Sequence, residues 1–239
     1  LRVVEFCTDS GTTGSLLEET SDTFVRLCHS LDDRPLLLPL PDTHELIWFS
    51  ERDGWGHLYL YDLKTGEQKN RITGLKNSAN DDNKWIVRDI LHFDTEQREL
   101  LVQTAGRDST ISPYYQDVCR VNIDSGELIS LVEGPYEHIV FAPHRPQMLI
   151  AVAYGLDVPG INGVAPSGNY VVTTRSRVDM LPVSLLLDRE GKEVLTLETA
   201  QDVGLSENWY WPEPVAVKGV DGETDLYGVI YRPPDFSPE

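Results

Sequence analysis

Two groups of residues in this chain suggest chemistry: the acidic pair Glu18-Glu19 and the polar turn Ser50-Glu51-Arg52-Asp53-Gly54-Trp55. Two neighbouring carboxylates could hold the ammonium group of a ligand. The pair lies in a strand-like stretch, residues 16–20, and adjacent side chains on a strand point to opposite faces of a sheet. We therefore expect that Glu18 and Glu19 do not share a binding site.

The polar turn at residues 50–55 is interpreted as fold chemistry rather than catalysis. Aspartate and glycine suit a turn, and we expect Arg52 to pair with Asp53 or Glu51 and Trp55 to cap the sheet. Similar polar turns recur at Arg107-Asp108 and Arg177-Val178-Asp179. A catalytic site needs only one copy, so a feature of every unit indicates a structural role.

The histidines and cysteines do not form a metal-binding pattern. The six histidines are scattered, without metal-ligand spacing, and His57, on an alternating strand, is interpreted as a structural histidine. The three cysteines form neither a disulfide framework nor a zinc motif. We expect Cys7 and Cys119 to lie in the core and assign no position to Cys28.

Familiar catalytic signatures are absent from the sequence. It has no Gly-x-Ser-x-Gly nucleophile elbow, phosphate-binding P-loop, dinucleotide-binding glycine motif or His-Glu-x-x-His pair. We therefore predict no catalytic, cofactor-binding or metal-binding residue in this chain, and the substrate-binding residues stay unknown.

The charge of the chain restricts its partners. With 20 basic and 39 acidic residues, the net charge is −19. Such a surface repels phosphate backbones, so we expect no nucleic-acid binding. It suits cationic ligands such as a peptide amino terminus, although solubility alone is the more ordinary explanation. No apolar run of about 18 residues predicts a membrane span and no signal peptide is visible, so the compartment stays unknown.

The elements that carry these residues repeat along the chain. Tight turns contain a glycine at four positions, 55, 60 and 65 residues apart: Gly11, Gly66, Gly126 and Gly191. Repeats of this length, made only of strands, predict small antiparallel sheets that stack face to face, as β-propeller blades do.

The expected strands fall into units. Residues 1–20 give two strands, and three units of four strands follow, at 36–40, 45–49, 57–61 and 68–72, then 85–93, 99–103, 118–122 and 128–132, then 138–141, 170–174, 183–187 and 194–197. Residues 148–164 interrupt the third unit, and we interpret them as an extra strand plus a loop.

We divide the chain into about three and a half blades (1–199), an aromatic linker (200–213), and a hairpin with an Asp221-Gly222 turn that begins a following domain (214–239). The chain starts at Leu1 and its last strand leads into nothing, so it reads as an internal piece of a longer protein. An open arc of blades would leave apolar sheet faces uncovered, so we predict self-association.

Three stretches resemble one family. Residues 50–62, Ser-Glu-Arg-Asp-Gly-Trp-Gly-His-Leu-Tyr-Leu-Tyr-Asp, resemble the signature blade of the dipeptidyl peptidase IV-type propeller in the prolyl oligopeptidase (S9) serine peptidase family. Residues 167–182 resemble a late blade of that propeller, and residues 221–234 resemble the strand pair that leads into its α/β-hydrolase domain. Two departures are local: the length of 148–164, and Asn169 in place of a more usual Asp-Gly-Arg/Lys-type turn.

The resemblance implies an all-β fold: a partial β-propeller of four-stranded antiparallel blades, then a β-hairpin that leads into a missing α/β-hydrolase domain. The parent would be a serine exopeptidase that removes dipeptides from peptide amino termini, often after proline or alanine, with its Ser, Asp and His beyond Glu239. This chain would shape substrate access and peptide binding and be inert alone. The family's substrate-gripping Glu-Glu pair sits on a helical insertion, a context that Glu18-Glu19 does not match.

Two other functions are weighed. A non-catalytic β-propeller interaction scaffold would close its ring after the last blade, without the linker and hairpin of residues 199–239. A propeller enzyme with a central metal would need inward carboxylates or histidines on several blades, and none recur here.

Overall fold

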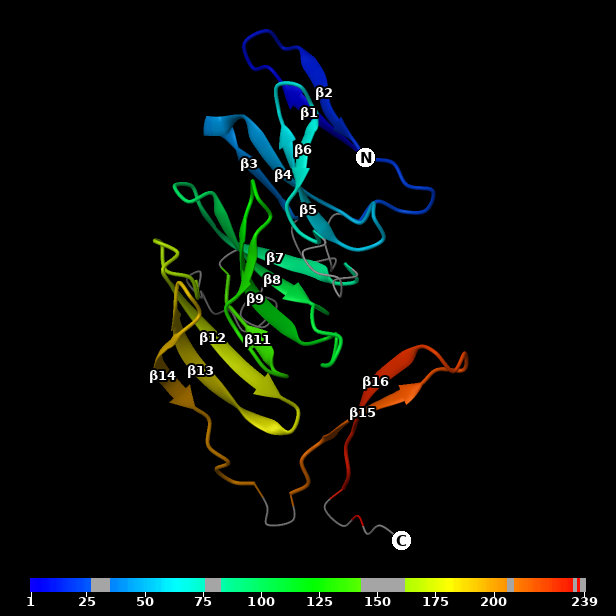
Figure 1. Ribbon diagram of the computed structural model, residues 1–239, viewed down its shortest axis with the longest axis vertical. Coiled ribbons are helices and arrows are strands. Elements are labelled where there is room, and N and C mark those ends of the chain that lie inside the picture. The colour runs from blue at the N-terminus through cyan, green and yellow to red at the C-terminus, as the bar shows by residue number, and fades with distance from the viewer. Residues whose placement is uncertain (27–34, 76–82, 143–161, 206–208, 234–235, 237–239) are drawn as a thin grey trace.

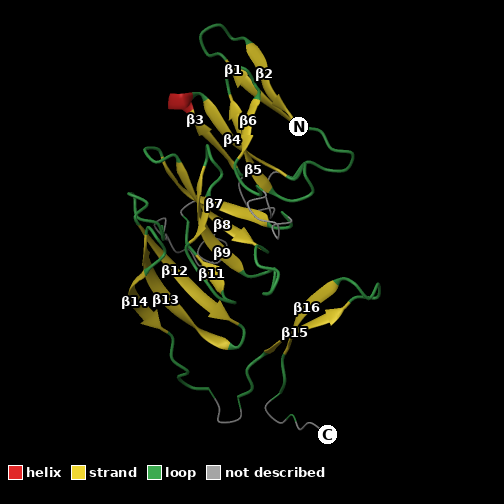
Figure 2. Cartoon of the chain, in the orientation of Figure 1, coloured by secondary structure: helices red, strands yellow, loops and turns green. Residues whose placement is uncertain are grey.

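The computed structural model describes residues 1–26, 35–75, 83–142, 162–205, 209–233 and 236 (Figure 1). Within these residues the regular structure is β-strand, apart from one short 3-10 turn at Pro41–Thr43 (Figure 2). All strand pairs are antiparallel. The all-β class predicted from the sequence is confirmed.

Three sheets have four strands each, hydrogen-bonded in sequence order. They are β3 (Leu37–Leu40), β4 (Glu45–Ser50), β5 (His57–Asp62) and β6 (Gln68–Arg71); β7 (Ile86–Asp94), β8 (Glu99–Ala105), β9 (Gln116–Asn122) and β10 (Leu128–Ser130); and β11 (Glu137–Ile139), β12 (Tyr170–Arg177), β13 (Met180–Asp188) and β14 (Glu193–Thr199). Two hairpins flank them: β1 (Arg2–Phe6) with β2 (Thr13–Glu18), and β15 (Glu213–Lys218) with β16 (Asp225–Ile230).

The four-stranded units therefore lie where the repeats predict them. One difference is the turn of the third sheet, where the ladder continues through the pairs Arg175↔Val183 and Arg177↔Met180. The sequence predicted these two strands at 170–174 and 183–187, whereas in the structure only Val178-Asp179 separate them.

Apolar side chains on both faces of the central strands explain why the sheets stack. On β4, Leu46 and Trp48 belong to a core shared with Leu17 of the β1–β2 hairpin. Ile47 and Phe49 belong to a second core, shared with the sheet β7–β10. Adjacent residues on a strand face opposite sides, so β4 supplies two cores at once and all of its residues are buried.

The next sheet repeats this arrangement. On β8, Leu100 and Val102 join the core toward β3–β6, whereas Leu101 joins a third core shared with Val171 and Leu187 of the last sheet. Each fully buried large apolar side chain contributes about 1.5–3 kcal/mol. The shared cores therefore hold the sheets in the sequential stack visible in Figure 1, which is the blade arrangement of a partial propeller.

The repeated glycines form part of each joint between neighbouring units. Gly66, Gly126 and Gly191 have φ of 74°, 71° and 85°, the left-handed region that favours glycine. Each also presses on the preceding unit: a Cβ added at Gly191 would come 2.5 Å from the Leu131 carbonyl oxygen. Sequence reasoning predicted the turn conformation of these glycines but not their contact with the neighbouring sheet.

Partly exposed ion pairs complete the joints. Arg98, in the β7–β8 turn, donates to Glu45 of the preceding sheet at 2.9 Å and to Asp124 at 2.7 Å. Arg189, in the β13–β14 turn, pairs with Asp94 at 3.0 Å and with Glu99. Each arginine thus binds a carboxylate of the sheet that precedes its own in the sequence, a contact that we call an arginine clasp.

The interruption in the third unit lies mostly outside the described residues, so the extra strand expected there stays a prediction. At its end, Val164 forms an isolated antiparallel bridge with Val171. The following turn closes with the Gly168 amide donating to the Ala165 carbonyl at 2.8 Å, and Asn169 lies between this turn and β12.

Candidate functional site

The candidate site is the loop edge, which we define by the turns between the second and third strands of the three large sheets: residues 51–56, 106–115 and 178–179. These turns point to the side of the molecule on which the β15–β16 hairpin lies (Figure 1). Each contains or directly follows an arginine, with an aspartate one or two residues later: Arg52-Asp53, Arg107-Asp108 and Arg177-Val178-Asp179.

The first turn contradicts the expected pairing of Arg52 with Asp53 or Glu51. Its guanidinium lies over the Tyr59 ring, 4.6 Å from the centroid, and donates to Glu19 at 3.1 Å. Asp53 instead accepts from the Tyr59 hydroxyl at 2.6 Å. The β5 tyrosines offer Arg52 an aromatic surface and the N-terminal hairpin a carboxylate, which together replace the local ion pair.

The remaining groups of this turn also have structural partners. Asp53 pairs with Arg71 at 3.1 Å, and Glu51 pairs with Arg26 at 3.7 Å. Trp55 is 41% exposed and does not pack as a cap.

Glu18 and Glu19 do not share a site, as predicted. Glu18 pairs with Arg2 at 3.0 Å on the outside of the hairpin. Glu19 turns inward and accepts from the Trp48 indole N–H at 2.6 Å and from the Ser50 hydroxyl. With Arg52 as a third donor, Glu19 ties the hairpin to the sheet β3–β6, a role that sequence reasoning missed.

The second turn places Arg107 against a buried thiol. Its Nη1 donates to Cys119 Sγ at 2.9 Å, and its guanidinium lies 5.9 Å from the Trp85 ring centroid. Burial raises the pKa of Cys119, so it stays a neutral thiol. Asp108 accepts from the Thr110 hydroxyl at 2.6 Å, which lowers the pKa of Asp108.

The third turn is closed by Arg177, which donates to both carboxylate oxygens of Asp179 at 2.7 Å each. This two-point pair is a strong, planar arrangement. It holds the short hairpin turn in place and lowers the pKa of Asp179.

Two carboxylates give the loop edge its acidic character between the second and third sheets. Asp117, at the start of β9, is 9% exposed, and burial raises its pKa while Arg107 opposes the rise. Glu137, on β11, accepts from the Gln116 amide at 2.7 Å and from its side chain at 2.6 Å. Arg107 and Glu137 both act electrostatically on Asp117. A pair of carboxylates favours a cationic group over an anion.

The C-terminal hairpin meets this edge through an aromatic contact. The rings of Tyr114, in the second turn, and Tyr227, on β16, have centroids 6.1 Å apart in an edge-to-face arrangement. In the linker before the hairpin, Trp209 and Trp211 make a similar contact at 6.3 Å. The β15–β16 hairpin itself forms as the sequence predicted.

His57 is a buried structural histidine, as expected. Its Nδ1 lies 3.2 Å from Thr73 Oγ1 and its Nε2 lies 3.2 Å from the Asn83 carbonyl oxygen. In the part of the chain that the structure describes, no three histidine, cysteine or acidic side chains come together as a metal site.

Of the cysteines, Cys119 is buried as predicted, but the prediction for Cys7 is wrong. Cys7 is exposed because it lies just past β1, in the hairpin turn that Gly11 closes. Cys28, His29 and His144 fall outside the described residues. Within the described residues, no helix is long and apolar enough to cross a membrane.

Comparison with known proteins agrees with this architecture. Residues 1–159 match the model of the family described as "Dipeptidyl peptidase IV (DPP IV) N-terminal region".

Two solved structures share the fold. A protein from Bacteroides ovatus ATCC 8483 assigned as a dipeptidyl aminopeptidase IV aligns with a TM-score of 0.66 and 21% identity, over 99% of this chain and 31% of its own. A puromycin hydrolase aligns with a TM-score of 0.52 and 17% identity, over 99% of this chain and 30% of its own. The chain thus spans about a third of each of these proteins. On the match over residues 1–159, the chain belongs to the dipeptidyl peptidase IV N-terminal region family.

Proposed function

We propose that this chain is the late part of the propeller of a serine exopeptidase, where its loop edge faces a catalytic domain and shapes the access of peptide substrates. No catalytic residue is assigned to the chain, and we propose that it is inert alone. Family membership over residues 1–159 supports the peptidase class.

The observation that carries the proposal is the position of the β15–β16 hairpin. Through Tyr227 it contacts Tyr114 on the loop edge. A domain that continued from β16 would therefore start beside the second turn of the loop edge, which leads into β9 and Asp117. We accordingly assign residues 1–199 to blades, 200–213 to the linker and 214–239 to the first strands of a hydrolase domain.

Charge favours the same role. Asp117 and Glu137 lie at the loop edge of a chain whose net charge is −19. An acidic surface raises the local concentration of cationic ligands. A peptide amino terminus carries such a charge at neutral pH, whereas nucleic acid would be repelled.

The alternative is a non-catalytic interaction scaffold. A scaffold gives no role to the β15–β16 hairpin, because β15 and β16 add no strand to the three large sheets. The peptidase role gives the hairpin a function as the entry into a second domain.

The test compares this chain with the longer reading frame that contains it. We expect no hydrolysis of dipeptide-proline chromogenic substrates by the purified chain. We expect hydrolysis by a product that extends beyond Glu239 through a Gly-x-Ser-x-Gly motif. Turnover by the chain alone that a serine-directed inhibitor blocks would refute the proposal.

We also propose that the isolated chain associates with a second copy through its last sheet. Leu195 and Leu197 on β14 are about half exposed, as apolar residues of an uncovered sheet are. Light scattering should give a mass above that of a monomer, and Leu195→Lys should lower it. Leu226→Lys, at a similarly exposed site on β16, should leave the mass unchanged. A monodisperse monomer at high concentration contradicts this proposal.

A further inference from the structure

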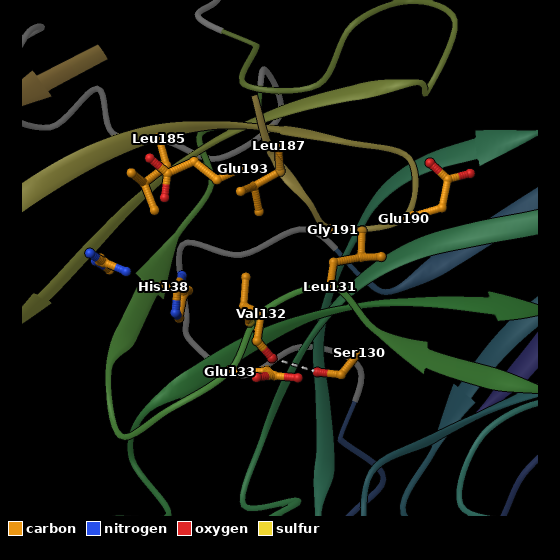
Figure 3. Close-up of a pocket in the computed structure, with 11 residues that line it drawn as sticks. Ser130, Leu131, Val132, Glu133, His138, Leu185, Leu187, Glu190, Gly191 and Glu193 are labelled. Atoms are coloured by element: carbon orange, nitrogen blue, oxygen red, sulfur yellow. Dashed lines mark hydrogen bonds between the residues drawn. The ribbon is translucent and has the colours of Figure 1, made fainter. Parts of the chain in front are cut away.

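The second joint, between the sheets β7–β10 and β11–β14, contains two histidines. His138, on β11, lies at one end of a pocket of about 250 Å³, with Leu131 on one side and Leu187 on the other (Figure 3). His92, on β7, packs under the turn that leads into β12, because a Cβ added at Gly168 would lie 2.9 Å from its ring atoms. Both imidazoles therefore lie where the second and third sheets meet.

The His138 ring is buried and lacks an acceptor for a second proton. Only 3% of the residue is exposed, and Nδ1 lies 3.4 Å from the Thr173 hydroxyl oxygen. That hydroxyl donates its one proton to the Ile139 carbonyl, so its oxygen accepts from Nδ1–H and the proton-free nitrogen is Nε2. Among the described residues, Nε2 has no hydrogen-bond partner. A proton added there would have no oxygen to bind.

The charge that acts most strongly on His138 is positive. His138 and Arg175 are cross-strand partners on β11 and β12, and the side chains of such partners share one face, with Cβ atoms about 4.5–5.5 Å apart. The Arg175 guanidinium lies 5.4 Å from the Tyr136 ring centroid, and its buried Nε–H has no acceptor in the described part of the chain. A second positive charge would thus lie beside a guanidinium that is not fully hydrogen-bonded.

The carboxylates around His138 do not reverse this effect. Three of them line the same pocket: Glu133, Glu190 and Glu193. Glu137, the neighbour of His138 on β11, already accepts two hydrogen bonds from Gln116. Burial, and after it Arg175, lower the pKa of His138 from 6.5 to about 4. The ring is therefore neutral at pH 7 and gains its charge only in acid.

His92 has similar surroundings on the other side of the joint. Arg120 of β9 donates to the Gly168 carbonyl at 3.1 Å, on the turn that covers the ring. Burial lowers the pKa of His92, and Arg120 and Arg189 lower it further, whereas Asp94 opposes the change. Asp94 is itself paired with Arg189 at 3.0 Å. The other carboxylates near these groups are Glu99, which pairs with Arg189, Glu190, which acts on Arg120, and Glu96 on the exposed β7–β8 turn.

We propose that the second joint is an acid-sensitive switch, in which protonation of His92 and His138 releases the third sheet from the second. The neutral rings pack between the sheets, whereas the charged rings lie beside arginines on both sides of the joint. Water solvates the charged rings better than the closed joint does, so acid favours the open state. Undocking would also displace the third turn of the loop edge, which β12 and β13 carry.

The direction of the pH dependence follows from proton linkage. A histidine whose pKa is lower in the closed state than in the open state takes up a proton on opening. The closed state is therefore fully favoured above pH 6.5 and loses stability as the pH falls toward the closed-state pKa. For His138, with values of 6.5 and about 4, the equilibrium constant of opening should rise roughly 25-fold between pH 7.5 and pH 5.

The test is native-state hydrogen exchange of the whole chain between pH 7.5 and pH 5, corrected for the intrinsic pH dependence of exchange. An undocked sheet buries neither face, so the amides of β12 and β13 report on opening. Their protection should fall at least about 25-fold over this range. Asp117, whose pKa burial raises, acts in the opposite direction as the pH falls, so the effect of the histidines is read from variants.

Two substitutions remove the titrating groups. His138→Asn keeps an amide donor for Thr173, and His92→Gln keeps a polar side chain, but neither takes up a proton. The double variant should retain a pH dependence of less than about threefold, whatever its absolute stability, because the readout is the change with pH. His44→Asn is the matched control, at an exposed position with φ of 54° that asparagine tolerates. It should keep the full dependence.

A further variant keeps both histidines and tests the arginine, so the proposal stays falsifiable if the double variant does not fold. Arg175→Met removes the charge and keeps an unbranched side chain. It should raise the pH at which His138 takes up its proton, measured by the ¹⁵N shift of the imidazole.

The proposal is overturned if the exchange of β12 and β13 does not change between pH 7.5 and pH 5. It is equally overturned if the double variant keeps the pH dependence of the wild type, since the titrating groups would then lie elsewhere. A midpoint of His138 that Arg175→Met leaves unchanged would contradict the electrostatic basis of the switch.

Discussion

The joints between successive sheets and the attachment of the C-terminal hairpin use different means. Each joint between the large sheets combines a shared apolar core, a glycine pressed against the neighbouring backbone, and an arginine clasp. The hairpin leaves β16 exposed along its whole length and meets the stack through the Tyr114–Tyr227 ring contact. The stack therefore specifies its own geometry, whereas the hairpin depends on its linker.

The largest effect is expected at a joint glycine. Gly191→Ala must accommodate a positive φ and a Cβ against the Leu131 backbone, so we expect a loss of about 3 kcal/mol in the free energy of unfolding. Gly11→Ala has the same kind of φ but open space around it, and should lose about 1 kcal/mol. Denaturant titration measures both, and equal losses would show that the close contact does not matter.

A smaller effect is expected at the arginine clasp. Arg98 and Lys69 lower the pKa of Glu45 from 4.5 to about 2, against the opposing effect of burial. A carboxylate with a depressed pKa stabilises the fold above its ordinary pKa, and that stability is lost as pH falls from about 4.5 toward 2.

Glu45→Gln should therefore cost about 2 kcal/mol at pH 7 and flatten the acid-side decline in this window. Glu96→Gln, at an exposed turn position, is the matched control and should change neither. If the unfolding free energy of the wild-type chain does not change between pH 5 and pH 2, the ion pairs of Glu45 contribute little to stability.

The smallest effect is expected at the hairpin. Tyr227→Ala removes one exposed ring pair and should lower the unfolding free energy of the stack by less than about 1 kcal/mol. A double-mutant cycle with Tyr114→Ala measures the pair itself. A loss comparable to that of Gly191→Ala would mean that the hairpin is part of the stack.

Most of the fold could be predicted from the sequence because the strands and turns depend on local signals. Alternation on β4 and β5 and glycine turns at 66, 126 and 191 predict strands, turns and stacking. The partners of Arg52 could not be predicted in this way, because Glu19 lies 33 residues away in the sequence and only the packed sheets bring them together. The same holds for Arg189, which donates to Asp94, 95 residues earlier in the sequence.

The direction of the glycine contacts has a consequence for biosynthesis. Gly66, Gly126 and Gly191 each rest on a unit that lies earlier in the chain, at Leu16, Ile72 and Leu131. A growing polypeptide offers these earlier surfaces first, as it emerges residue by residue from the ribosome. Each new sheet can therefore pack on a sheet that has already been synthesised, so the arc can fold before the carboxyl terminus is made.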